Sequence, residues 1–148
     1  MRSEQGFKEA YSWYFEEHST ETVLIPKKIT VQILKSLISS LGLIDQPKIL
    51  IGFSQGGFLA PVLAQELTNV EKIIGLGCSY RKESYANLSH VKVFGIHGSE
   101  DTIVDFEAAA AAYDQLPPQL KAGWTVVPEM HHAINEAARV ALLKYISQ

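Results

Sequence analysis

The chain has 148 residues, of which 47% are hydrophobic and 20% charged, and its formal net charge at pH 7 is −3. This length allows one sizeable hydrophobic core but not two, so we expect a single domain over residues 1–148. The charge balance excludes a basic surface for nucleic acid or anionic lipid, and no apolar stretch is long enough to span a membrane. The first residues lack the apolar core of a signal peptide and the single Cys78 permits no internal disulfide, so a cytoplasmic location is expected.

Regular hydrophobic patterns begin at residue 28. Residues 28–41 place apolar side chains at helical spacing, and Gly42 follows where a helix often ends in a left-handed residue. Four short apolar runs then predict buried strands: KILIGF, KIIGLG, VKVFGI and WTVVP. Helical stretches at 55–67, 106–116 and 133–146 alternate with them. This order predicts an α/β fold with an open, mostly parallel sheet and helices on both faces, in which active groups collect at the carboxyl ends of the strands.

The segment Gly52-Phe53-Ser54-Gln55-Gly56 fits the pattern G-x-S-x-G between a predicted strand and a predicted helix. In that context the pattern indicates a nucleophile elbow, a sharp turn that lifts the serine hydroxyl above the sheet. We expect side chains at both glycine positions to collide with this turn. The backbone N–H of Gln55, at the helix start, would then lie where it can stabilise an oxyanion. The alternative is a structural turn with an idle serine.

A nucleophilic serine needs a base, and the base needs an orienting carboxylate. Asp101 follows the third predicted strand, and His131 and His132 follow the fourth. The order Ser, Asp, His along the chain is that of α/β-hydrolases. Glu100 and Asp105 could substitute for Asp101, although Asp105 fits better as the N-cap of the next helix.

Other polar residues near the predicted strand ends have plainer explanations. We interpret His97 as a structural neighbour of the site and Cys78 as a core residue. A metal site built from His97, the later histidines and nearby carboxylates would lack any known ligand spacing. Tyr80 and the polar stretch after it could form a substrate lip or an ordinary surface loop.

Three blocks, GFSQGG, HGSEDTIV and MHHAI, resemble those of the phospholipase/carboxylesterase family of α/β-hydrolases, which are small serine esterases and acyl thioesterases. The similarity begins near Tyr11, where YSWYFE resembles the family's W-F segment. It implies Ser54 as nucleophile and Asp101 as orienting acid. His132 would be the base, because the family's histidine precedes one residue and then an aliphatic one; His131 stands where glycine is usual. The implied reaction cleaves a carboxylic ester or thioester through an acyl-enzyme, without metal or organic cofactor.

The same resemblance predicts a truncated α/β-hydrolase fold. Family members open with strands that carry an H-G-x-G-type loop, the source of a second oxyanion donor, and no such motif precedes Ser54. Loss of one such donor costs about 10²- to 10³-fold in rate, so we expect slow hydrolysis. Without those strands KILIGF becomes an exposed apolar sheet edge, which predicts either self-association through that edge or a chain that is the product of a shortened reading frame.

Two other hypotheses assign the chain a different function. A catalytically weak or inactive α/β-hydrolase remnant could act as a binding or interaction module, and it would share the fold of the enzyme. A flavodoxin-like ligand binder would leave the positions of Asp101 and His132 unexplained.

Overall fold

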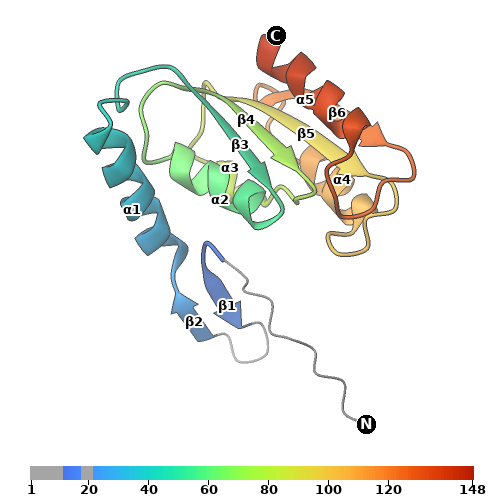
Figure 1. Ribbon diagram of the computed structural model, residues 1–148, viewed down its shortest axis with the longest axis horizontal. Coiled ribbons are helices and arrows are strands. Elements are labelled where there is room, and N and C mark those ends of the chain that lie inside the picture. The colour runs from blue at the N-terminus through green and yellow to red at the C-terminus, as the bar shows by residue number, and fades with distance from the viewer. Residues whose placement is uncertain (1–11, 18–21) are drawn as a thin grey trace.

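The computed structural model describes residues 12–17 and 22–148, which are built around a four-stranded parallel sheet (Figure 1). The strands lie side by side in chain order, and each coincides with one of the predicted apolar runs to within a few residues. They are β3 (Lys48–Phe53), β4 (Val70–Leu76), β5 (Lys92–Gly98) and β6 (Lys121–Val127). The predicted α/β class with a parallel sheet is confirmed, and all four strands end at the same edge.

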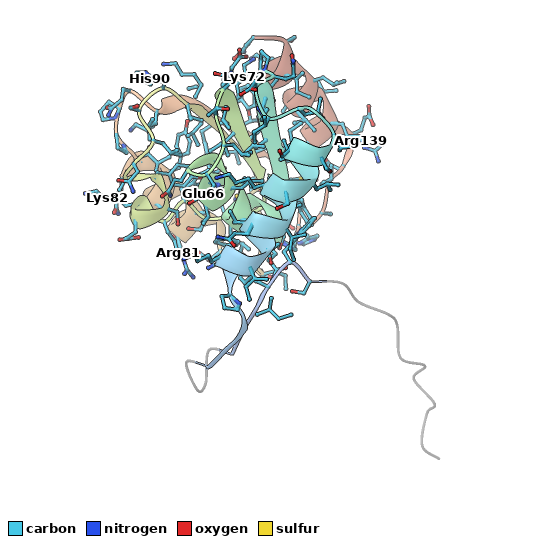
Figure 2. All side chains as sticks on the ribbon, turned by 90° about the vertical axis from the view of Figure 1, so that its left-hand side faces the viewer. Glu66, Lys72, Arg81, Lys82, His90 and Arg139 are labelled. Atoms are coloured by element: carbon cyan, nitrogen blue, oxygen red, sulfur yellow. The ribbon has the colours of Figure 1, made fainter. Side chains whose placement is uncertain are left out.

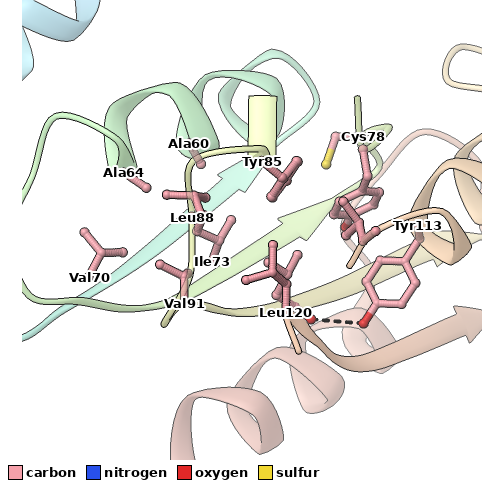
Figure 3. Packing of buried hydrophobic residues seen from close by; sticks show 13 residues of the cluster. Ala60, Ala64, Val70, Ile73, Cys78, Tyr85, Leu88, Val91, Tyr113 and Leu120 are labelled. Carbon is pink, nitrogen blue, oxygen red and sulfur yellow. Dashed lines mark hydrogen bonds between the residues drawn. The ribbon is translucent and has the colours of Figure 1, made fainter. Parts of the chain in front are cut away.

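Helices cover both faces of this sheet, as predicted. They are α1 (Lys27–Ser40), α2 (Gln55–Ala64), α3 (Lys82–Tyr85), α4 (Phe106–Asp114) and α5 (Glu136–Ser147). Side chains of α2, α3 and α4 pack on one face with Ile73 and Val93, a cluster shown in Figure 3. The next residue of each strand points the opposite way, so Ile74 and Phe94 pack with α5 on the other face.

Three helices are shorter than their sequence patterns. The helix predicted over 55–67 ends at Ala64, the one predicted over 106–116 ends at Asp114, and the one predicted over 133–146 begins at Glu136. Asn135 sets that later start, because its side chain accepts a hydrogen bond from the backbone N–H of Ala138 (2.9 Å). Residues 131–135 thereby remain a loop at the carboxyl end of β6.

A two-stranded antiparallel hairpin precedes α1 and was not predicted. It pairs β1 (Phe15–Glu17) with β2 (Thr22–Ile25). Strands of three and four residues are too short to show an alternating pattern. No helix in the described ranges is long and apolar enough to cross a membrane.

Two residues of uncertain role, Cys78 and Tyr80, lie in the core. Tyr80 is 1% exposed and its hydroxyl donates to the carbonyl of Gly75 (3.1 Å), so it does not line a substrate lip. The charged residues 81–83 that follow it are exposed at the surface, but the ring of Tyr80 packs in the core. Cys78 is fully buried, and burial raises the pKa of its thiol to about 12. A thiol with that pKa is not a nucleophile at neutral pH, as the core interpretation requires.

Helix α1 confirms the predicted amphipathic helix, and Gly42 follows it with the left-handed φ of +71°. Only part of its apolar surface is buried, where Val31 and Leu34 pack against α2. Another row of apolar side chains, spaced four residues apart, is more than half exposed: Ile29, Ile33, Leu37 and Leu41. Figure 2 views the molecule from the side of α1. No element of the described ranges covers this row.

Strand β3 is an outer strand, which the sequence analysis predicted. Within the described ranges it pairs with β4 alone, and the side chain of Ile51 is 48% exposed. An unpaired apolar edge invites pairing with another chain, so self-association through β3 remains our prediction.

If this edge pairs two copies, Ile51→Lys should lower the sedimentation coefficient at high protein concentration to that of a monomer, since a charged side chain cannot be buried in the new contact. Val140→Lys is the matched control, because Val140 is 61% exposed on α5, away from this edge. A wild-type chain that sediments as a monomer at every concentration contradicts the prediction.

Candidate active site

Ser54 lies on the turn between β3 and α2 in a backbone conformation that non-glycine residues rarely adopt, with φ 49° and ψ −119°. Three backbone hydrogen bonds hold it there. Its N–H donates to the carbonyl of Leu76, at the end of β4 (2.9 Å), and its carbonyl accepts from Gly57 (2.9 Å) and Phe58 (3.2 Å). Such strain persists where the surrounding structure enforces it, and it is characteristic of functional turns.

The two glycines of the elbow differ in their surroundings. A Cβ atom on Gly52 would lie 2.4 Å from the backbone carbonyl of Gly56 and 2.5 Å from the nitrogen of Gly57. Gly52 therefore leaves room for the first turn of α2. The expectation that Gly56 prevents a similar collision was wrong, because the nearest atom to a Cβ there is Nε1 of Trp13 at 3.6 Å, an ordinary contact.

The structure brings together Ser54, Asp101 and His132, which come from the loops after three different strands. Ser54 Oγ lies 2.9 Å from Nε2 of His132, and Nδ1 of His132 lies 2.8 Å from Oδ2 of Asp101. A carboxylate accepts hydrogen bonds, so Nδ1 of His132 carries the ring proton and donates a hydrogen bond to Asp101. Nε2 is then free to accept the hydrogen bond from the Ser54 hydroxyl.

The carboxyl group of Asp101 is held from both sides. Its Oδ1 accepts backbone hydrogen bonds from Ile103 (3.0 Å) and Val104 (2.9 Å), and the residue is 3% exposed. Burial alone would raise the pKa of Asp101, but the hydrogen bonds from His132, Val104 and Ile103 outweigh it and hold the pKa below its ordinary value. Asp101 is therefore ionised at neutral pH.

His97 supports the loop that carries Asp101, in line with its interpretation as a structural neighbour. It is fully buried, and its Nε2–H donates to the carbonyl of Val104 (2.8 Å). The same nitrogen lies 3.4 Å from Oδ2 of Asp101, and the ring stacks on Trp124 with 5.8 Å between centroids. Nδ1 of His97 has no hydrogen-bond partner within the described ranges.

The alternative candidates lie outside this arrangement. His131 is exposed, with Nδ1 3.0 Å from the carbonyl oxygen of Glu100 and Nε2 3.4 Å from its carboxylate. Asp105 caps α4, because its side chain accepts from the N–H of Ala108 (2.8 Å). Within residues 12–17 and 22–148, no group of three or more histidine, cysteine, aspartate or glutamate side chains could hold a metal ion.

Two close neighbours of His132, Phe53 and Gly77, were not predicted from the sequence. The ring of Phe53 packs against that of His132, with centroids 4.8 Å apart. Gly77 has a φ of +50°, and a Cβ there would lie 3.3 Å from Oδ2 of Asp101 and 3.4 Å from Nδ1 of His132. The one available signal was a glycine at the end of a predicted strand, which is too common to be specific.

Gln55 is the first residue of α2. The N–H groups of a helix's first turn have no carbonyl partner within the helix, and they lie at the positive end of its dipole. The backbone N–H of Gln55, which directly follows Ser54 in the chain, is one of these groups and lies at the end of α2 that favours negative charge.

A search against protein-family models matches residues 11–148 to the phospholipase/carboxylesterase family. The chain belongs to this family. The resemblance seen in the three sequence blocks is thereby confirmed over almost the whole chain. No curated protein gives a significant sequence match.

Solved structures share the family's fold at low sequence identity. Esterase PE8 superposes with a TM-score of 0.70 and 20% identity over 93% of this chain and 69% of its own. Acyl-protein thioesterase 2 of Zea mays gives 0.69 and 14% over 92% and 71%, and the esterase domain of a Rhodothermus marinus protein gives 0.62 and 16% over 79% and 64%. This chain thus spans less than two thirds of the length of that Rhodothermus domain.

Proposed function

We propose that this chain is a serine hydrolase that cleaves carboxylic esters or thioesters through an acyl-enzyme on Ser54. One observation carries the proposal: the continuous hydrogen-bonded path from Ser54 Oγ through His132 to Asp101, with distances of 2.9 and 2.8 Å. Family membership and the names of the neighbours, an esterase and an acyl-protein thioesterase, support the substrate class.

In the proposed reaction Nε2 of His132 takes the hydroxyl proton as Ser54 Oγ bonds to the substrate's carbonyl carbon. The carbonyl π electrons move to its oxygen, which becomes an oxyanion facing the N–H of Gln55. Collapse of this intermediate breaks the bond to the alcohol or thiol, which leaves with the proton from His132. Water then attacks the acyl-enzyme by the same steps, and the acid and free Ser54 result. Asp101 stabilises the cationic histidine throughout, and no metal or organic cofactor takes part.

The rate depends on how many donors face the oxyanion. In this chain the backbone N–H of Gln55, at the start of α2, supplies one such donor.

A second candidate is a weak or inactive hydrolase-like protein that acts as an interaction module. It is favoured by the exposed row of apolar side chains on α1 and by the outer strand β3. The two candidates differ in whether the Ser54 hydroxyl is activated.

Reaction with a fluorophosphonate probe, followed by intact-mass measurement and peptide mapping, tests this difference. We expect one adduct per chain at Ser54 and none in Ser54→Ala. The control is Ser40→Ala, since Ser40 is an exposed serine at the end of α1 whose hydroxyl donates only to a backbone carbonyl. A folded wild-type chain that remains unlabelled contradicts the hydrolase proposal and favours the interaction module.

A further inference from the structure

The side chain of Gln55 binds a segment more than 40 residues earlier in the chain. Its Oε1 accepts from the backbone N–H of Trp13 (2.7 Å) and lies 2.9 Å from the hydroxyl oxygen of Ser12, whose single proton is shared with the carbonyl of Tyr14 at 2.7 Å. Its Nε2 donates to the carbonyl of Tyr14 (2.8 Å). One carboxamide thus bonds Trp13 and Tyr14 and contacts Ser12.

These bonds hold Trp13 beside the first turn of α2. The carbonyl of Trp13 accepts a hydrogen bond from the hydroxyl of Thr30 on α1, which fixes the segment from the other side. The indole nitrogen lies 3.6 Å from where a Cβ on Gly56 would be. Gly56 is two residues from Ser54, so the indole is a near neighbour of the turn that carries the nucleophile.

Trp13 also lines a groove between the outer strand β3 and helices α1 and α2, and Gly56 is the lining residue nearest to Ser54 in the chain. The groove has a volume of about 290 Å³, and its lining includes Gly56, Ile51, Leu59 and Leu34. These residues are apolar, and the volume lies just below the range of about 300–1,000 Å³ for small-molecule sites. An aliphatic chain of a few carbons is the ligand that such a lining favours, because its burial removes apolar surface from water.

We infer that Gln55 is a positioning residue whose side chain holds Trp13 in place as a wall of the subsite for the substrate's acyl chain. The inference rests on the proposed function, because it assigns a substrate contact next to Ser54. One residue then serves the reaction twice: the backbone of Gln55 faces the oxyanion, and its carboxamide fixes the wall beside the acyl chain.

The position of Trp13 is tested without any reaction. Acrylamide quenching of Trp13 fluorescence should rise in Gln55→Ala towards the value of free tryptophan, because the ring loses its support. The chain has two tryptophans, so the signal of Trp124 is measured in Trp13→Phe and subtracted. Gln65→Ala is the matched control. Gln65 directly follows the last residue of α2, and its side chain also donates to the carbonyl of a residue distant in the chain, Ser84 (2.7 Å).

The role of Trp13 is tested with two esters of different acyl length, p-nitrophenyl acetate and p-nitrophenyl octanoate. Gln55→Ala and Trp13→Ala should each lower kcat/KM for the octanoate by about tenfold, mainly through KM, while the acetate value falls by less than about threefold. The double variant should be no worse than either single one, because Gln55 acts through Trp13.

The possible outcomes separate the two proposals. Unchanged quenching in Gln55→Ala overturns the positioning role, whether or not the chain hydrolyses esters. Increased quenching with an unchanged ratio of octanoate to acetate kcat/KM overturns the acyl subsite. Absence of both Ser54 labelling and ester hydrolysis overturns the proposed function and the subsite with it, and the quenching result then still decides whether Gln55 positions Trp13.

Discussion

Replacing His132 by glutamine is expected to lower kcat/KM for an activated ester by about 10⁴-fold or more. Glutamine keeps a polar side chain in the site but cannot take the proton of Ser54 and return it to the leaving group. The neighbouring histidine cannot replace it, because His131 is exposed and faces Glu100. We therefore expect the loss to persist at every pH at which the protein is folded.

The matched control is His131→Gln, which changes the same residue type one position earlier. It should alter kcat/KM by less than about threefold, since His131 contacts neither Ser54 nor Asp101 in the structure. Initial rates with p-nitrophenyl acetate at several pH values measure both variants. If His131→Gln loses activity and His132→Gln retains it, the assignment of the base is reversed; equal, small losses exclude both as the base.

Replacing Gly52 by alanine should reduce the free energy of unfolding by about 3 kcal/mol. Its Cβ would lie 2.4–2.5 Å from backbone atoms of Gly56 and Gly57, and backbone in the first turn of a helix cannot move aside as a flexible side chain does. The strain would be relieved only by shifting α2 away from β3. Urea denaturation followed by circular dichroism measures the effect.

Gly56→Ala is the comparison, because the same change is made on the same turn. Its Cβ meets only the indole nitrogen of Trp13 at 3.6 Å, so we expect no loss of stability. A gain of up to about 1 kcal/mol is expected, since alanine favours a helix more than glycine does. Equal destabilisation by the two substitutions would show that the elbow pattern requires glycine at both positions for a reason other than contact.

Chemical patterns with a strong local signal were predictable. Apolar runs bounded by turns fixed the four strands of the sheet, and G-x-S-x-G between a strand and a helix identified the turn at Ser54. The order Ser54, Asp101 and a histidine near 131–132 followed from the same logic, because the loops after parallel strands meet at one edge. Helix ends were less predictable, since a single cap such as Asn135 outweighs the periodicity before it.

Contacts between distant segments were not predictable. The pattern of α1 does not distinguish the side chains that pack on α2, such as Val31, from the exposed Ile33 and Leu37, because helical spacing marks an apolar surface but not what covers it. Similarly, Tyr80 stands in a polar stretch of sequence, yet its ring is buried and its hydroxyl bonds a strand carbonyl.

By itself, the sequence determined the fold class and the family, and it identified Ser54, Asp101 and, through the resemblance to the family block, His132 as the candidate site, because each depends on residue types at fixed local spacing. Only the tertiary structure showed that His132 lies within hydrogen-bond distance of Ser54, separated the roles of Gly52 and Gly56, and joined Gln55 to Trp13. The physical reason is the same in each case. Two adjacent histidines, or two glycines on either side of Ser54, have similar local sequence. They differ in the structure because each has different neighbours once segments distant in the chain have packed together.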